Sequence, residues 1–178
     1  MTIHAFIDES ARGRTYLITV TVSAPHELGP VRRELKGLLL PGEREIHFKK
    51  TKNPRRRTLA DRMSSMPVTA HVYMTDYTSK TEEDARQRCL DRTVRDLVVA
   101  GARRIVLDSR QWHRDVHDKG TLQRALGERP SKTELTYEHM ESPMEPILWV
   151  SDAVGWCYGA GGAWKTRIGP IIERVVEL

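Results

Sequence analysis

The stretch AFIDESARGRTYLITVTV, residues 5–22, decides how the sheet of this chain begins. The mostly apolar residues 3–7 predict a short, buried strand. A polar turn that contains Gly13 follows, and the dense β-branched run Tyr16–Val22 predicts a second strand. The simplest arrangement of the two strands is a hairpin.

Asp8 and Glu9 come directly after the first predicted strand. Acidic residues are common in turns, which gives the pair an ordinary explanation. The alternative is that the strand presents a carboxylate at the end of the sheet, where α/β proteins build their active sites. The remaining sequence has to separate these two interpretations.

Helices and strands alternate along the rest of the chain. A strand over 68–74, a helix that opens near Thr81 and closes at Gly101, and a strand over 103–108 form a βαβ order that indicates parallel strands. Further helices are predicted over 25–40, 54–65 and 145–160, and further strands over 44–50 and 133–140. Residues 109–130 are polar and weakly periodic, so we interpret them as an insertion or a mobile flap, and we expect residues 111–128 to be dispensable for folding. The prediction is an α/β fold, with a mixed sheet of about five strands between helices.

The composition fits a single domain over residues 1–178. Hydrophobic residues make up 39% of the chain and charged residues 30%, as is typical of globular domains. We find no apolar stretch of the roughly 20 residues that cross a membrane and no signal peptide, and expect a cytoplasmic protein. Cys89 and Cys157 lie in apolar helical patterns, which favours core residues over a disulfide. The net charge of +5 and the pI of about 9.4 permit an anionic partner.

Four acidic residues, Asp8, Glu45, Asp108 and Asp152, stand at the edges of apolar elements. A carboxylate in an apolar helix, such as Asp152, needs a partner, and an arginine would be sufficient. Several carboxylates that converge repel each other, and Mg²⁺ or Mn²⁺ relieves that repulsion because these ions prefer oxygen ligands. The pattern therefore raises the hypothesis of a metal centre for phosphodiester hydrolysis. Asp76 also follows a strand and is the alternative to Asp108.

Four segments together resemble the landmarks of the bacterial domain-of-unknown-function-3800 family (DUF3800). They are FIDES (6–10), EIHFKK (45–50), IVLDS (105–109) and ILWVSDAVGW (147–156). The chain departs from the family pattern at Ala11, where Gly is usual, and at Ser151, which precedes the helical Asp in place of Ala. The resemblance implies a ribonuclease-H-like sheet flanked by helices. It also implies that Asp8, Glu45, Asp108 and Asp152 form the acidic cluster, with Glu9 replacing or supporting one of them.

The run KKTKNPRRR, residues 49–57, directly follows Glu45 and contains six basic residues. Most charge runs are solvated turns, but this one would border the proposed metal site. Lys and Arg hold phosphate backbones without reading the sequence. The candidate nucleic-acid-binding residues are therefore Lys49, Lys50, Lys52, Arg55, Arg56 and Arg57.

Other side chains have two interpretations. His47, predicted on the same strand face as Glu45, is either a helper that orients water or phosphate or an exposed strand histidine. Trp149, Trp156 and Trp164 have the aromatic surface to stack bases, but the spacing of the first two within an apolar helix is typical of core residues.

The sequence therefore predicts a Mg²⁺- or Mn²⁺-dependent nuclease that acts on RNA, DNA or a hybrid. The first alternative is a non-catalytic nucleic-acid-binding or regulatory protein that keeps the ribonuclease-H-like fold. The second is a metal-dependent phosphoesterase of a small molecule. The salt dependence of binding separates the last from the others, since polymer binding weakens steeply as salt rises.

Overall fold

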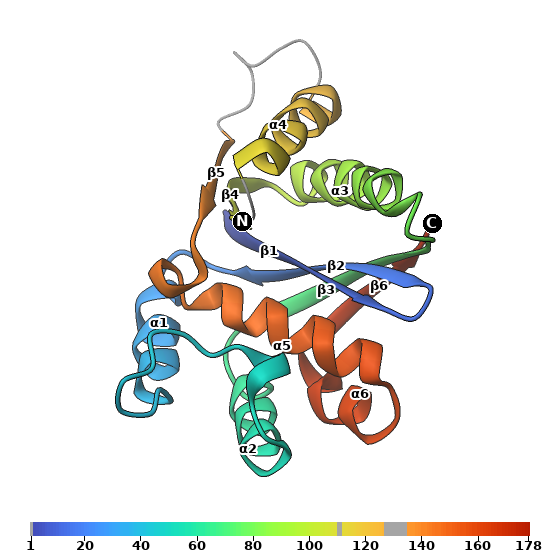
Figure 1. The fold of residues 1–178 in the computed structure, drawn as a ribbon. Coiled ribbons are helices and arrows are strands. Elements are labelled where there is room, and N and C mark those ends of the chain that lie inside the picture. Colours follow the sequence, from blue (N-terminus) through green and yellow to red (C-terminus); the bar gives the residue numbers. More distant parts are fainter. Residues whose placement is uncertain (1, 110–111, 127–134) are drawn as a thin grey trace.

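A six-stranded mixed sheet forms the centre of the molecule in the computed structural model, which describes residues 2–109, 112–126 and 135–178 (Figure 1). The strand order is β5-β4-β1-β2-β3-β6. The strands are β1 (Ile3–Arg12), β2 (Thr15–Ser23), β3 (Thr69–Asp76), β4 (Ala102–Asp108), β5 (Thr136–Met140) and β6 (Ile172–Glu177). The predicted α/β class with a mixed sheet is confirmed.

The first three strands form an antiparallel meander, and the other three join it in parallel. The predicted hairpin of β1 and β2 is present, and Gly13 has the positive φ of 59° that its turn requires. β3 and β4 run in the same direction, as the βαβ order requires, but β2 and β1 lie between them. The sequence pattern did not predict β6, because three consecutive residues of that strand are exposed and no alternation marks it.

Helices cover both faces of the sheet (Figure 1). α5 lies across one face together with α1, α2 and α6, while α3 and α4 cover the other. The helices are α1 (Leu28–Gly37), α2 (Asn53–Met63), α3 (Glu82–Val99), α4 (Trp112–Leu126), α5 (Ile147–Ala160) and α6 (Gly162–Ile168). Each face has its own apolar core, and successive residues of β1 alternate between them: Phe6 packs toward α5, and Ile7 packs toward α3.

The first strand is longer than predicted. It continues past Ile7 to Arg12, because β2 pairs with it along its whole length. The parallel ladder with β4, however, ends at the pair Ile7–Leu107. Asp8 is therefore in the middle of a strand and at the end of one of its two ladders. The expectation that Asp8 ends the strand was wrong, but Asp8 does lie where the partner strand stops.

Residues 44–50 are not a strand. The predicted alternation is real, since Ile46 and Phe48 are buried, but the segment pairs with no strand among the residues that the structure describes. Residues 48–50 form a 3₁₀ turn, η1 (Phe48–Lys50). The burial came from packing against the core on the α5 face rather than from a place in the sheet.

The predicted starts of α2 and α3 lie within one residue of the observed ones. Lys52 is the N-cap residue of α2, and Asn53 is the first helical residue. Thr81 is the N-cap residue of α3, but its side chain makes no hydrogen bond to the helix, because its hydroxyl accepts from the backbone N–H of Thr78 instead.

The segment 109–130 is not a dispensable insertion. Residues 112–126 form α4, which packs against α3. Asp118 and Leu122 are fully buried there, so the segment contributes to the core. Residues 110–111 and 127–130 lie outside the described part of the chain.

The buried helix and the small core residues were predicted correctly. α5 buries Trp149 and most of its other side chains. Cys89 and Cys157 are buried free thiols. The strand expected over 133–140 is present as β5. Within the described residues, no helix is both long and apolar enough to cross a membrane.

Candidate active site

Two carboxylates come from neighbouring strands at the same level. Ile7 of β1 pairs in parallel register with Leu107 of β4, so Asp8 and Asp108 are the next residues of the two strands. Both follow residues that face α3, and side chains alternate along a strand, so both carboxylates face α5. Adjacent strands lie about 4.8 Å apart, which brings two such side chains within electrostatic reach.

Asp152 reaches the same place from α5. The hydroxyl of Ser151 donates to the carbonyl oxygen of Phe6 at 2.9 Å and lies 2.7 Å from the hydroxyl of Thr21. The hydroxyl of Thr19 donates to the Ser151 carbonyl oxygen at 2.9 Å. Ser151, one of the two departures from the family pattern, therefore ties α5 to β1 and β2 beside Asp152.

A glycine keeps the helix close to the sheet one turn later. A β-carbon at Gly155 would lie 3.1 Å from Cβ of Ser10 and 3.3 Å from Oγ1 of Thr19. Contacts this short force neighbouring atoms to move. The close approach of α5 to β1 at this point depends on the missing side chain.

Burial and neighbouring charges raise the pKa of two of the carboxylates, Asp8 and Asp108. Burial raises the pKa of Asp8 well above its usual value, and the charges of Asp152 and Asp108 raise it further. Burial also raises the pKa of Asp108 to about 7, again together with Asp152. Two acids from adjacent strands and one from a helix therefore share one region of negative charge, as functional sites commonly do.

Asp152 also contacts the segment before α2. Its Oδ2 accepts a hydrogen bond from the backbone N–H of Phe48 at 2.7 Å. Nδ1 of His47 lies 3.5 Å from the same oxygen. Hydrogen bonding and charge from Asp152 raise the pKa of His47, so the imidazolium is favoured beside the carboxylates. His47 thus lies at the site, although not on the predicted strand.

Glu45 and Asp76 have different surroundings. Glu45 is partly buried, and its charge contributes to the raised pKa of Asp108 and of His47. Asp76 is exposed at the end of β3, opposite Thr15, where it lines a surface hollow with Arg88. Of the two candidates, Asp108 is the one grouped with Asp8 and Asp152.

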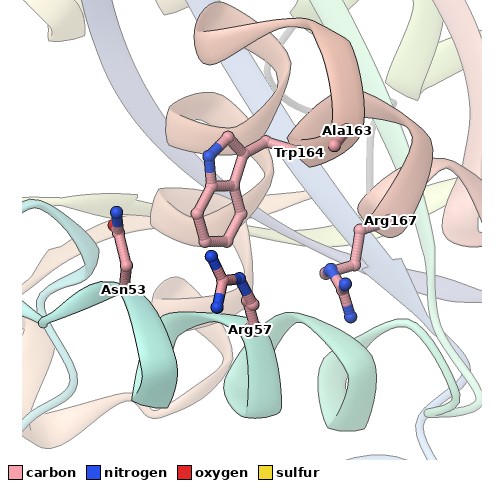
Figure 2. A pocket seen from close by; sticks show the side chains of 5 residues that line it. All are labelled: Asn53, Arg57, Ala163, Trp164 and Arg167. Atoms are coloured by element: carbon pink, nitrogen blue, oxygen red, sulfur yellow. The ribbon is translucent and has the colours of Figure 1, made fainter.

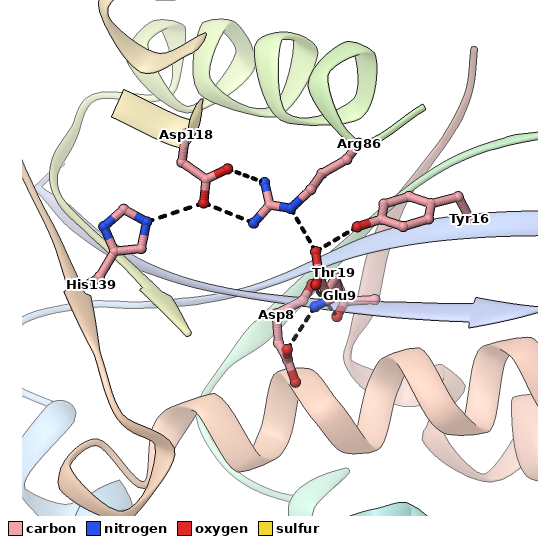
Figure 3. A network of polar contacts seen from close by, with 7 residues as sticks. All are labelled: Asp8, Glu9, Tyr16, Thr19, Arg86, Asp118 and His139. Atoms are coloured by element: carbon pink, nitrogen blue, oxygen red, sulfur yellow. Dashed lines mark hydrogen bonds and ion pairs between the residues drawn. The ribbon is translucent and has the colours of Figure 1, made fainter. Parts of the chain in front are cut away.

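Glu9 belongs to the opposite face of the sheet (Figure 3). Its Oε2 lies 2.7 Å from Nε of Arg86 and accepts a hydrogen bond from the hydroxyl of Tyr16. The other end of the Arg86 guanidinium binds Asp118 through two hydrogen bonds, and Asp118 also contacts His139. Glu9 is therefore held by a cation on the α3 face and does not join the site on the α5 face.

This network was missed in the sequence, although one signal marks it. Arg86 occupies the same helical stripe as Leu90, Thr93 and Leu97, which are all buried. A charged residue within such a stripe needs a buried partner. The sequence could not identify that partner, because Glu9 and Asp118 are far away along the chain.

The basic segment divides into internal and external side chains. Arg55 binds the Glu43 carboxylate and the carbonyl oxygen of Leu38. Arg56 is buried, donates to the Phe48 carbonyl oxygen and lies 3.9 Å from the ring centre of Trp156. The other four side chains are exposed: Lys49, Lys50, Lys52 and Arg57.

The donor atoms of the site suit a hard divalent cation. They are carboxylate oxygens, the ligands that Mg²⁺ and Mn²⁺ prefer. Burial raises the pKa of Asp8 and Asp108, and repulsion from Asp152, which a cation would relieve, raises it further. However, no three His, Cys, Asp or Glu side chains in the described ranges are arranged so that they could hold a metal ion. The carboxylate donors suit a divalent cation, but the described side chains are not arranged to coordinate one.

Comparison with known proteins shows the fold. A ribonuclease HII structure, solved in complex with PCNA from Archaeoglobus fulgidus, matches with a TM-score of 0.52 and 14% sequence identity. The match covers 88% of this chain and 70% of the other. The predicted ribonuclease-H-like fold is thereby confirmed. No family model and no curated protein matches the chain, so the resemblance to the DUF3800 family stays a prediction.

Proposed function

We propose that this protein is a divalent-metal-dependent nuclease that hydrolyses phosphodiester bonds in nucleic acid. The observation that carries the proposal is the grouping of Asp8, Asp108 and Asp152 on one face of the sheet, where burial and the charge of Asp152 raise the pKa of both Asp8 and Asp108. Burying like charges together costs stability, and proteins tolerate that cost mainly at functional sites.

Asp8, Asp108, Asp152 and Glu45 would hold the metal. When bound, Mg²⁺ or Mn²⁺ would supply an activated water and stabilise negative charge in phosphodiester cleavage. The chain itself contributes the orientation of its carboxylates. The Ser151 hydrogen bonds and the Phe48 N–H fix the position of Asp152, and the β1–β4 register fixes Asp8 and Asp108.

His47 would transfer a proton or donate a hydrogen bond to a phosphate oxygen. Its raised pKa favours the imidazolium, whose N–H groups are donors to an anionic substrate. The exposed residues Lys49 and Lys50 follow it directly. They would bind the substrate backbone together with Lys52 and Arg57, whereas the internal partners of Arg55 and Arg56 assign those two to holding α2 in place.

The comparison supports the same class of reaction. The matched structure is a ribonuclease HII, and its title describes a complex with PCNA. An exposed basic segment next to the carboxylates is consistent with a polymeric substrate. We therefore propose nucleic acid, as RNA, DNA or a hybrid, as the partner of this chain.

One observation favours a second candidate, a non-catalytic nucleic-acid-binding or regulatory protein. It is the lack of a ready ligand geometry for a metal within the described residues. This candidate predicts binding without cleavage, and no effect of Mn²⁺ on stability.

A cleavage assay with matched variants separates the candidates. The purified protein is incubated with labelled RNA, DNA and hybrid duplexes, with Mn²⁺, Mg²⁺ or EDTA. We expect metal-dependent cleavage that falls by orders of magnitude in Asp8→Asn and Asp152→Asn. Asp76→Asn is the control, because it removes the same charge from an exposed strand end outside the cluster. Binding by the parent without cleavage of any substrate would establish the second candidate.

A further inference from the structure

A small hollow lies between α2 and α6, on the α5 side of the sheet (Figures 1 and 2). Its lining is formed by Asn53, Arg57, Ala163, Trp164 and Arg167. Figure 2 shows the Trp164 indole between the side chains of Asn53 and Arg167, with Arg57 at the edge of the ring. The nuclease proposal does not assign a role to this hollow.

The size of the hollow excludes most small-molecule ligands. Its volume is about 120 Å³, whereas ligand pockets usually measure about 300 to 1,000 Å³. It has room for roughly four water molecules at about 30 Å³ each. One flat ring of a larger molecule fits these dimensions better than a whole metabolite does.

The Trp164 ring packs against the ring of Trp156, and the Arg56 guanidinium lies near both rings. Its centre lies 5.2 Å from that of Trp156, in an edge-to-face arrangement. Arg56 lies 3.9 Å from the ring centre of Trp156 and 5.8 Å from that of Trp164. Trp164 itself is only half-buried. A partly exposed indole on a rigid support is a suitable stacking surface.

The charges around the ring differ in their availability. The Arg167 guanidinium already binds the Asp61 carboxylate at 2.5 and 2.6 Å. The Arg57 side chain is exposed, and among the described groups none forms a hydrogen bond or ion pair with it. Arg57 is thus the available cation at the hollow, next to the aromatic surface.

The hollow is connected to the carboxylates through α5. Asp152 and Trp156 are four residues apart on that helix, so they share a face and differ by about 6 Å along the axis. The step from Trp156 to Trp164 adds 5.2 Å. Stacked nucleotides rise about 3.4 Å along one strand, so a strand bound at the carboxylates would reach Trp164 within a few nucleotides.

We propose that the hollow is a base-stacking subsite of the substrate strand: an unpaired nucleobase stacks on Trp164 while Arg57 binds a phosphate beside it. The inference rests on the proposed nuclease function and adds to it a requirement for a single-stranded segment near the cleaved bond. Aromatic rings interleaved with cations are typical of single-strand binding, because every base offers a face for stacking.

The test compares an oligonucleotide of about 12 nucleotides with an abasic strand of the same length. Binding is measured in EDTA by fluorescence anisotropy, on RNA and DNA strands separately. The parent should bind the base-bearing strand more tightly than the abasic one. Trp164→Leu should lose this preference, with about 5- to 150-fold weaker binding of the base-bearing strand. Trp164→Phe should retain most of it.

Arg57→Gln is a second test variant. Because Arg57 is exposed, we expect this variant to fold even if Trp164→Leu does not. It should weaken binding of both strands equally and reduce the slope of log affinity against log salt by about 0.7 for a single-stranded contact. Lys165→Gln removes the same charge from an exposed position of α6 outside the lining and should leave both unchanged.

The outcomes distinguish this inference from the proposed function. If the parent binds and cleaves nucleic acid but has the same preference for bases as Trp164→Leu, the subsite is wrong and the nuclease stands. An effect of Arg57→Gln no larger than that of Lys165→Gln would equally overturn the phosphate contact. If the parent binds neither strand and cleaves none of the substrates, both proposals fail together.

Discussion

Asp8 and Glu9 are neighbours in the sequence and have opposite surroundings. Asp8 faces α5, where burial and then the charges of Asp152 and Asp108 have the largest effects on its pKa. Glu9 faces α3, where Arg86 and Tyr16 bind its carboxylate. Side chains alternate between the two faces of β1, so Asp8 and Glu9 point to opposite faces of the sheet (Figure 3). Asp8 thus lies among other acids, whereas the charge of Glu9 is balanced by Arg86.

The difference teaches what each face contributes. A buried carboxylate bound to a cation is held in place, and removing its partner is strongly destabilising. A carboxylate among other carboxylates is destabilised by its neighbours and gains from anything positive that enters. We therefore expect the Arg86 network on the α3 face to support the fold and the acids on the α5 face to gain from a positive ligand.

The largest effect is expected on the compensated face. Arg86→Gln leaves the buried Asp118 without its bidentate partner and should cost about 3 to 5 kcal/mol in the free energy of unfolding. The loss should be the same with Mn²⁺ and with EDTA, as measured by urea denaturation. Arg95→Gln on the same helix breaks an exposed ion pair with Asp91 and should leave stability unchanged. Equal losses in the two variants would contradict the comparison.

The next effect concerns metal binding on the α5 face. The parent should gain about 2.7 kcal/mol when free Mn²⁺ is a hundredfold above its dissociation constant. Asp152→Asn should be as stable as the metal-free parent or more so, because the amide keeps its shape and removes one repelling charge. It should also lose most of the gain from Mn²⁺. Melting curves of both proteins with and without Mn²⁺ measure this. A parent that gains nothing, with a much less stable metal-free variant, would refute the metal site.

The two adjacent acids give a direct internal comparison. Glu9→Gln removes the ion pair with Arg86 and weakens the charged hydrogen bond from Tyr16, and should cost about 1.5 to 3 kcal/mol. Asp8→Asn should cost nothing in EDTA, since it removes a charge that its neighbours oppose. Chemical denaturation of the two variants under one set of conditions decides the order. The reverse order of stabilities would show that the faces have been assigned to the wrong roles.

The smallest effect is a pH dependence, reduced by the partial exposure of Asp108 to solvent. The pKa of Asp108 is about 7 in the folded state, against a usual 3.8, so the folded state binds more protons between these values. Its contribution to stability is therefore complete below about pH 4 and is lost as the pH rises through 7. In EDTA, Asp108→Asn should be less sensitive than the parent to a change from about pH 5 to pH 8. An identical pH dependence of the urea midpoint in both proteins would contradict this cause.

The site was more predictable from the sequence than its supporting segments were. Asp8, Asp108 and Asp152 each adjoin a strong apolar run, and such runs fix a strand or helix locally. The alternation of apolar and polar residues in 44–50 predicted correctly which side chains are buried, but it wrongly predicted a strand. An extended segment that packs on the core shows the same period of two as a strand of a sheet. α4 was misread as an insertion, since much of what it buries is polar: Asp118 and Thr121 lie beside Leu122. Contacts between residues distant in the chain, such as those of Arg86, leave no local periodicity that would identify their partners.

Gly155 is a position at which a single substitution could change the proposed activity of this fold during evolution. A single methyl group at that position would meet the side chains of Ser10 and Thr19 at 3.1 to 3.4 Å, so these neighbours would have to give by a few tenths of an ångström. Asp152 lies about one turn away on the same helix, so the position of its carboxylate depends on this close contact. Under the proposed nuclease function, a single codon change at Gly155 would be enough to disturb the placement of Asp152. Among relatives, we expect a larger residue at this position to accompany a weaker activity.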